Sequence, residues 1–317
     1  MSKEFLDKIL SISIIREALF WRKKISKFLR HKVFFRKKRR EKEWAKEKKK
    51  VLKDASKMFP YDISLDVTKR NGIYVFHNKG NTLVQRGTSY EPIIQHALMV
   101  LLFLDKLRGK STVLTDMGAN IGLHTFFLKS RYKDLNIIAF DPSPTSWKYM
   151  ELSIKYNNLH NIRLEKIALS DTNGTLDFYN WGDESSADSL KNTGRVPNVK
   201  PNIIQVPSKR LDDINDLPPI TVIKMDCEGA ELLILNGARR TLTENRPLIL
   251  LEFHPTNRKA FNIATEDIFR FLSEIKYSLY SLHFELLDVC KFEVSQQENE
   301  ENYIMLPNEL LASKKDD

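Results

Sequence analysis

Three acidic residues crowd into the stretch "KMDCEGAE" (224–231), directly after the apolar run "ITVI". A carboxylate at the end of an apolar run is costly unless it has a partner or a function. Carboxylates can stabilise a nearby cation, and they can accept the proton of a hydroxyl group. The stretch therefore predicts a site for a cationic group or a reacting hydroxyl. We expect Asp226 to act there as the base.

The other acids near this stretch carry weaker predictions. Glu228 lies close enough to Asp226 for like-charge repulsion to raise the pKa of one of these two carboxyl groups. Alternatively, Glu228 serves as an acid in the first turn of a helix, where it stabilises the helix dipole. Glu231 is interpreted as an acid on a helix surface. Glu252 lies near the end of the next apolar run, "LILLEF", and His254, which follows this run, is a second candidate base. The acids could instead hold a divalent cation, but we favour a site without metal.

A second cluster, "DMGANIG" (116–122), lies between an apolar run and a helical pattern. Open α/β sheets bind ligands at this place, where Gly118 lets the backbone approach a ligand and a helix N-terminus favours an anionic group. Asp141 ends the next apolar run, 23 residues after Gly118, and such an acid suits a ribose diol. Alternatively, the glycines serve packing and Asp116 caps the helix. The combination predicts a nucleoside-type ligand.

The elements that position these residues alternate between strands and helices from residue 112 onward. Apolar runs at 112–116, 136–140, 221–226 and 248–253 are separated by helical patterns. Near-continuous apolar strands alternating with helices predict a mostly parallel sheet with helices on both faces. Short strands within 61–87 and a helix over 91–109 precede it, and a polar loop, 181–201, interrupts it.

The charge pattern separates an N-terminal arm from the rest of the chain. The 317 residues carry a net charge of +10, but residues 21–53 alone carry +14 and residues 54–317 carry −4. The sequence predicts a basic helical arm over 1–58, strands and a helix over 59–111, and the main domain over 112–317. Aromatic residues among the lysines and arginines of 1–57 make an anionic membrane surface a candidate partner, and nucleic acid a less favoured one.

No signal peptide or membrane span is evident in this sequence, and its two cysteines form no CxxC motif. The expected location is therefore cytoplasmic. Peripheral attachment to a membrane through the arm is the alternative.

Five ordered motifs resemble those of the FkbM-type S-adenosylmethionine-dependent methyltransferases: "DMGANIG", "AFDPSP", "KIALSDTNGTLDFY", "IKMDCEGAE" and "LILLEFHP". The resemblance covers about 60–307 and implies a Rossmann-like class I methyltransferase fold. It also implies residue roles. The methionine end of the cofactor would be held by Asp116, Gly118, Ala119, Asn120 and Gly122, the ribose by Asp141, and the adenine near Ser170 and Asp171. The methyl group and acceptor would face Asp226, Glu228, Glu252 and His254.

The resulting expectation is an O-methyltransferase that uses S-adenosylmethionine. The resemblance and the surface-seeking arm favour a hydroxyl of a small molecule, sugar, glycan or glycolipid as acceptor. A ribose O-methyltransferase that the arm recruits to RNA is an alternative, and a non-catalytic scaffold with a cofactor fold is another. The acids at 116, 141, 226 and 228 argue against the scaffold, because a decayed site has no need of them.

Overall fold

The chain is described by a computed structural model that covers residues 37–58, 65–78, 91–182, 187–194, 196 and 199–310. It divides into two compact units, 1–54 and 55–317. Helix α3 (Lys37–Ser56) begins in the first unit and confirms the helix predicted for this part of the basic arm. Residues 1–36 lie outside the described residues, so the membrane contact of the arm stays a prediction. Among the described helices, none has both the length and the apolar character needed to cross a membrane.

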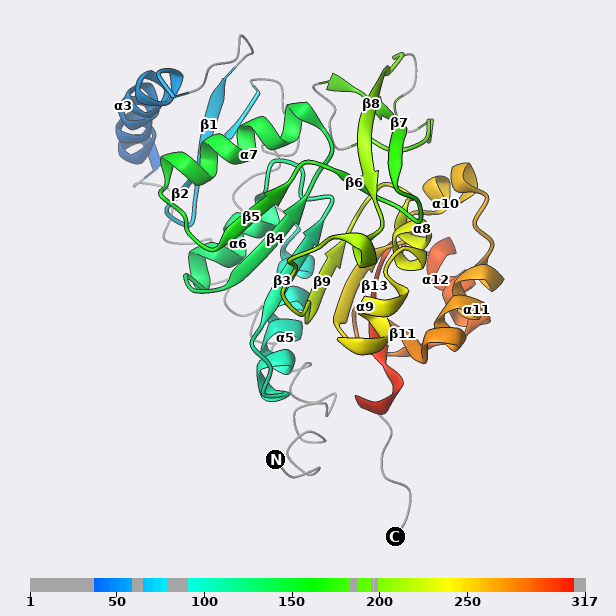
Figure 1. The fold of residues 1–317 in the computed structure, drawn as a ribbon. Helices are drawn as coiled ribbons and strands as arrows, with labels where there is room; N and C mark the ends of the chain where they lie inside the picture. Colours follow the sequence, from blue (N-terminus) through cyan, green and yellow to red (C-terminus); the bar gives the residue numbers. More distant parts are fainter. Residues whose placement is uncertain are drawn as a thin grey trace. The chain divides into compact units, whose positions relative to one another are not determined.

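The second unit is built on an eight-stranded sheet with the order β12-β11-β13-β10-β9-β3-β4-β5 (Figure 1). Its strands are β3 (Val113–Met117), β4 (Asn136–Phe140), β5 (Ile162–Glu165), β9 (Val222–Met225), β10 (Leu248–Glu252), β11 (Tyr277–Ser281), β12 (Leu286–Leu287) and β13 (Asn302–Pro307). The five strands from β10 to β5 pair in parallel, and β11, β12 and β13 add antiparallel pairs at one end. This arrangement confirms the predicted mostly parallel sheet.

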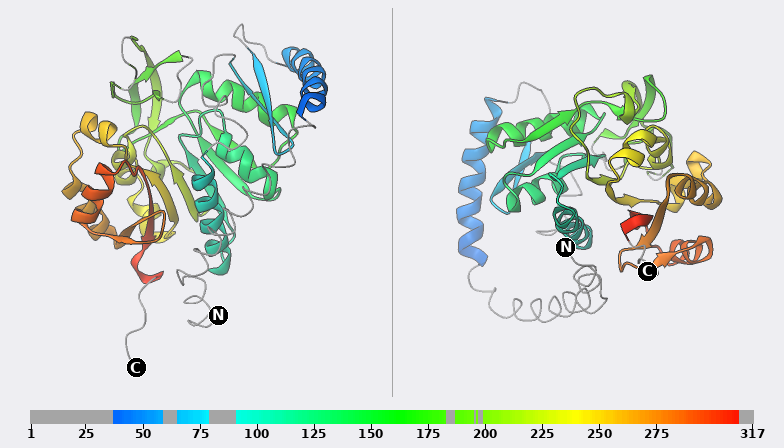
Figure 2. Two further views of the ribbon diagram at one scale, coloured as in Figure 1. Left: turned by 180° about the vertical axis from the view of Figure 1, so that it is seen from behind. Right: turned by 60° about the horizontal axis from the view of Figure 1, so that its bottom comes forward.

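Helices cover both faces of this sheet because its strands are apolar on both sides. Helices α5 (Pro92–Leu107) and α6 (Leu123–Arg131) share one core with Leu114 and Val222. The view from behind in Figure 2 shows α5 lying along that face. The opposite core joins Val113 and Ile223 to α8, α9, α10, α11 and α12. The bounds of these helices are Glu231–Asn236, Arg239–Glu244, Pro255–Phe261, Thr265–Ile275 and Val289–Gln297. Neighbouring strand residues therefore face opposite cores, as the strand period of two requires.

Two smaller sheets accompany the main one. Strands β1 (Asp66–Arg70) and β2 (Ile73–His77) form a hairpin against helix α7 (Pro144–Tyr156), with Asn71 and Gly72 at positive φ in its turn. Positive φ at both central positions is what a tight hairpin of this kind requires. The other sheet has the order β6-β8-β7, from β6 (Ala168–Leu169), β7 (Gly174–Asn180) and β8 (Asn202–Lys209). The second strand predicted within 61–87, residues 82–87, lies outside the described residues.

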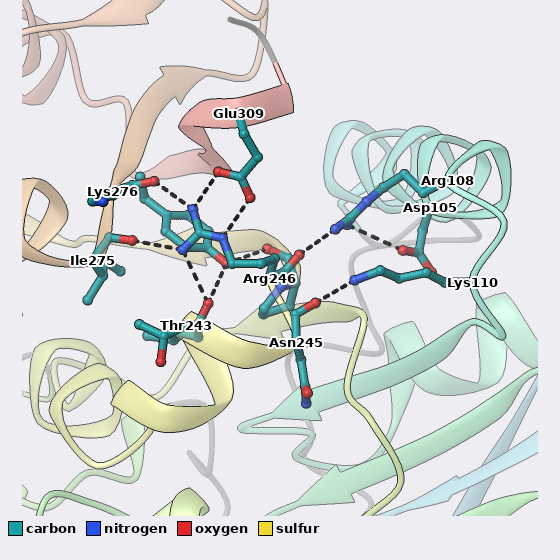
Figure 3. A network of polar contacts seen from close by, with 12 residues as sticks. Asp105, Arg108, Lys110, Thr243, Asn245, Arg246, Ile275, Lys276 and Glu309 are labelled. Atoms are coloured by element: carbon teal, nitrogen blue, oxygen red, sulfur yellow. Dashed lines mark hydrogen bonds and ion pairs between the residues drawn. The ribbon is translucent and has the colours of Figure 1, made fainter. Parts of the chain in front are cut away.

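Arg246 links several segments at the edge of the sheet where β10 begins. Its guanidinium donates to the backbone carbonyl oxygens of Ile275 and Lys276, both at 2.8 Å, and to both carboxylate oxygens of Glu309, each at 2.7 Å (Figure 3). Its own carbonyl oxygen accepts from Arg108 at 2.8 Å. One side chain thus joins the starts of β10 and β11 to the 3-10 turn η3 (Asn308–Leu310) after β13.

Replacing Arg246 with Ala should lower the free energy of unfolding by about 2–3 kcal/mol, because two backbone carbonyls lose a charged donor. The Arg246 side chain is 18% exposed, whereas that of Glu309 is 55% exposed. Glu309→Ala should therefore cost less than about 1 kcal/mol, as exposed ion pairs do. Urea unfolding of both variants measures the difference. Equal losses would show that the ion pair, and not the carbonyl contacts, carries the stabilisation.

Candidate active site

A cavity opens at the carboxyl ends of β3, β4, β9 and β10, the edge at which open α/β sheets bind ligands. The turns after β3, β4 and β9 and the last residue of β10 contribute to its wall. Its lining includes Glu91, Gly118, Ala119, Asn120, Ile121, His124, Phe140, Asp141, Ser143, Ile167, Ala168, Leu169, Asp188, Leu190, Lys224, Asp226, Glu228 and Glu252. Apolar side chains and carboxylates therefore line the same cavity.

The glycine turn after β3 reaches the cavity because Gly118 permits a very close backbone approach. The backbone N–H groups of Gly118 and Ala119 both donate to the carbonyl oxygen of Phe140 at 3.0 Å. Gly118 has φ +75°, and a Cβ added to it would lie 1.8 Å from the carbonyl oxygen of Asp226. Any other residue would have to push the turns after β3 and β9 apart. Gly122 also has positive φ, but it precedes α6 and does not line the cavity.

Asp141 is buried at the end of β4 and holds the glycine turn from the other side. One carboxylate oxygen accepts from the backbone N–H of Asn120 at 2.7 Å, and the other from that of Ser143 at 2.9 Å. Burial raises the pKa of Asp141 to about 7, although both hydrogen bonds lower it. The cavity thus contains a carboxylate that two backbone groups orient, and that changes charge near neutral pH.

Besides Gly122, three of the residues predicted to bind the cofactor lie away from the cavity wall. Asp116 is 1% exposed, accepts from the Thr125 hydroxyl at 2.6 Å, and is not among the lining residues. Ser170 is buried and Asp171 is exposed, and neither lines the cavity. The neighbouring segment 167–169 reaches the cavity instead. Asp116 can therefore act on a ligand only through the residues around it.

Asp226, Glu228 and Glu252 meet in the cavity from two strand ends. Each offers a carboxylate oxygen, and these oxygens lie within 4.8 Å of one another. Glu228 has a left-handed backbone with φ +52°, and its Oε2 accepts from the Asn257 amide at 2.8 Å. Oxygen ligands at this spacing suit a divalent cation such as Mg²⁺ or Ca²⁺. Alternatively, they suit a positively charged organic group.

His254 is positioned by the fold to begin a helix. Its Nδ1 accepts from the backbone N–H of Thr256 at 3.1 Å, at the first turn of α10. Its Nε2 lies 3.2 Å from a carboxylate oxygen of Glu301, and the ring is not among the residues that line the cavity. The structure thus places His254 at the start of α10, and its role as a second base stays a prediction.

The expectation that Glu231 lies on a helix surface is wrong, because this residue is only 1% exposed. Its Oε1 accepts from the backbone N–H groups of Cys227 at 2.8 Å and Gly229 at 3.3 Å. Glu231 thereby closes the turn that carries Asp226 and Glu228. Burial raises the pKa of Glu231 to about 8. The sequence pattern could not reveal this role, because the first turn of an exposed helix also favours glutamate.

The raised pKa of Glu231 predicts how stability depends on pH. The folded state binds the proton more tightly than an unfolded glutamate with a pKa of 4.5, so the contribution of Glu231 falls as pH rises from about 4.5 to 8. The slope from one group is at most about 1.4 kcal/mol per pH unit. Glu231→Gln keeps an oxygen for the two N–H groups and cannot ionise. Its free energy of unfolding should therefore fall less over this range than that of the wild type.

Urea unfolding at several pH values measures this difference. Glu231→Ala is the control, because it removes the acceptor as well as the charge and should be destabilised even at pH 5. An identical pH dependence in the wild type and in Glu231→Gln would contradict the assignment.

Sequence reasoning missed Lys224, which is 5% exposed and lines the cavity. The sequence contained an indication of this site, because a lysine inside the apolar strand "TVIKM" needs a partner when it is buried. It also missed Asp188, which accepts from Ser143 Oγ at 2.8 Å and from the backbone N–H of Trp181 at 2.7 Å. Burial raises the pKa of Asp188 to about 7. The polar loop that contains Asp188 gave no sign that one of its acids would be buried.

A further missed pair is His124 and Glu91, whose side chains lie 3.0 Å apart on the cavity wall. They belong to the start of α6 and the residue before α5, which the sequence pattern identified only as helix ends.

The profile of the methyltransferase FkbM domain matches residues 116–279, just over half of the chain. The chain belongs to the FkbM methyltransferase family. The matched region contains the glycine turn, Asp141 and the acids of the turn after β9, and it ends within β11. The family resemblance in the sequence motifs is thereby confirmed.

Several curated methyltransferases are similar to this chain. Methyltransferase 1 of Beauveria bassiana is 27% identical over 43% of this chain and 64% of its own length. The 2-O-methyltransferase NoeI of Sinorhizobium fredii is 30% identical over 44% and 63%, respectively. The hexuronic acid methyltransferase AglP of Haloferax volcanii is 26% identical over 52% and 63%. The chain thus spans about three fifths of the length of the curated relatives it matches.

Among solved structures, an FkbM methyltransferase from Methylobacillus flagellatus matches with a TM-score of 0.39 and 18% identity. The match covers 61% of this chain and 43% of that one.

Proposed function

We propose that this FkbM-family protein transfers a methyl group from S-adenosylmethionine to a hydroxyl group, and that the acceptor hydroxyl belongs to a sugar or a sugar-bearing molecule. The single observation that carries the proposal is the composition of the cavity. It joins a buried, oriented Asp141 and apolar side chains to a cluster of carboxylates at Asp226, Glu228 and Glu252.

The lining fits this cofactor by its chemistry. Asp141 offers a carboxylate to the two ribose hydroxyls. The turn 118–121 lines the cavity together with Asp141 and offers backbone groups to the ligand. Phe140, Ile167 and Leu169 form apolar surface for a purine ring. The carboxylates at the other strand ends favour a positive charge. These residues would hold the cofactor at the carboxyl ends of the strands.

The protein's own part in the reaction is to orient the acceptor and to remove its proton. S-adenosylmethionine supplies, when bound, a methyl carbon on a positively charged sulfur. Asp226 is the proposed proton acceptor for the reacting hydroxyl, and it is 28% exposed, so an acceptor can reach it. Glu228 and Glu252 are proposed to hydrogen-bond the acceptor and fix its direction of attack.

The names of two relatives support the choice of acceptor. NoeI is a 2-O-methyltransferase and AglP acts on hexuronic acid, so an oxygen nucleophile and a sugar both occur among proteins similar to this one.

Calorimetry with S-adenosylhomocysteine tests the proposed function first. We expect binding, followed by transfer of labelled methyl groups to members of a panel of sugars, glycans, glycolipids and RNA.

A parallel assay with EDTA tests whether the acid cluster needs a divalent cation, and we expect methyl transfer to persist. Absence of both binding and labelled product would overturn the proposal, and a product formed only on RNA would replace the sugar with ribose as acceptor.

A further inference from the structure

Lys224 occupies a position where a charged side chain is costly. It lies within β9, directly opposite Asp116 of β3 and Leu250 of β10 in the register of the sheet. A buried ammonium group is tolerated only when it is paired and hydrogen-bonded. Its contacts should therefore explain why an otherwise apolar strand contains it.

The ammonium group of Lys224 contacts strand β3 and the turns after β3 and β9. It donates to the carbonyl oxygen of Gly118 and to Oδ2 of Asp226, both at 3.3 Å, and it lies 3.7 Å from Oδ1 of Asp116. Asp116 is itself fixed by the Thr125 hydroxyl. Lys224 thus connects the glycine turn after β3 to the acidic turn after β9.

The charges of this group suit a cavity for a cation. Lys224 contributes one positive charge, and Asp116 and Asp226 contribute two negative charges when ionised. The group therefore carries a surplus negative charge, and its member Asp226 lines the cavity together with Lys224. The lysine therefore does not repel a positively charged sulfur from this place, provided that both acids remain beside it.

We propose that Lys224 is a positioning residue for methyl transfer, and that it acts by holding the carboxylate of Asp226 against the glycine turn. This inference rests on the proposed function. One oxygen of Asp226 binds the ammonium group, so the rotation of the carboxylate is fixed and the other oxygen keeps a constant direction. Without Lys224, the partly exposed Asp226 carboxylate would lose the contact that directs its Oδ2 toward the ammonium group. A misplacement of about 1 Å at a reacting group can lower a rate about 10²-fold.

The competing explanation is that Lys224 only neutralises the buried Asp116. Two variants separate the explanations. Lys224→Met removes the ammonium group and leaves Asp116 buried without it, so the melting temperature should fall by more than about 5 °C. Asp116→Asn combined with Lys224→Met removes both charges from the interior. The melting temperature of this double variant should return close to that of the wild type.

The double variant then decides between the two roles. If Lys224 positions Asp226, the double variant is stable and binds S-adenosylhomocysteine, but its kcat is about 10²-fold below that of the wild type. Its crystal structure also shows the Asp226 carboxylate rotated away from the glycine turn. A stable double variant with wild-type kcat, or with an unmoved Asp226 carboxylate, would overturn the proposal.

These readouts also separate this inference from the proposed function. A wild-type protein that fails to bind S-adenosylhomocysteine refutes the function. The position of the Asp226 carboxylate in the double variant still tests the role of Lys224, because that measurement needs neither cofactor nor acceptor.

Discussion

Replacing Asp226 with Asn should lower the rate of methyl transfer by about 10² to 10⁴-fold and leave the affinity for S-adenosylhomocysteine nearly unchanged. The amide has almost the shape of the carboxylate, but it cannot take a proton from the acceptor hydroxyl. Because S-adenosylhomocysteine carries no charge on sulfur, the loss of the carboxylate should weaken its binding little. Single-turnover rates with labelled S-adenosylmethionine, together with calorimetry, measure the two quantities separately.

The neighbouring acids provide matched controls for this prediction. Glu228→Gln and Glu252→Gln remove one charge each from the same cluster. Glu228 is already bound to Asn257, and we expect both variants to retain more activity than Asp226→Asn. If Glu252→Gln abolishes turnover and Asp226→Asn retains it within about threefold, the proton acceptor is Glu252.

Local patterns predicted the parts of the site that depend on a single strand and its turn. The apolar runs before Gly118, Asp141 and Asp226 each proved to be a parallel strand, and all three residues line one cavity. This prediction succeeds because parallel strands end at the same edge of the sheet. An acid or glycine that follows such a strand therefore belongs to that edge whatever the strand order is.

Pairing across the sheet could not be read from the sequence. Asp116 and Lys224 are 108 positions apart, and their contact depends on β9 lying beside β3. The burial of Asp188 depends in the same way on the packing of a polar loop against Ser143 and Asn180. The sequence thus predicted where the strands end. Which basic side chain lies beside a given acid, as Lys224 lies beside Asp116, depends on the order of the strands in the sheet.

The other large effect should follow from Asp141→Asn, which should weaken binding of S-adenosylhomocysteine by about 10² fold. Each oxygen of Asp141 accepts a backbone N–H, from Asn120 or from Ser143. An asparagine has only one such oxygen, so its NH₂ group must face one of these donors in either orientation. The glycine turn should then shift, and the ribose hydroxyls should lose an anionic acceptor. Calorimetry at pH 7.5 gives the change in affinity.

The pH dependence of the same binding reaction identifies the group responsible. The pKa of Asp141 is raised to about 7, and the ionised form is the stronger acceptor for ribose hydroxyls, so wild-type affinity should rise between pH 6 and 8. Asp141→Asn should remove this rise. Asp188 is the necessary control, because burial also raises its pKa to about 7 and it contacts Ser143 beside Asp141. If Asp188→Asn removes the rise and Asp141→Asn preserves it, the titrating group is Asp188, and the ribose carboxylate assigned to Asp141 is wrong.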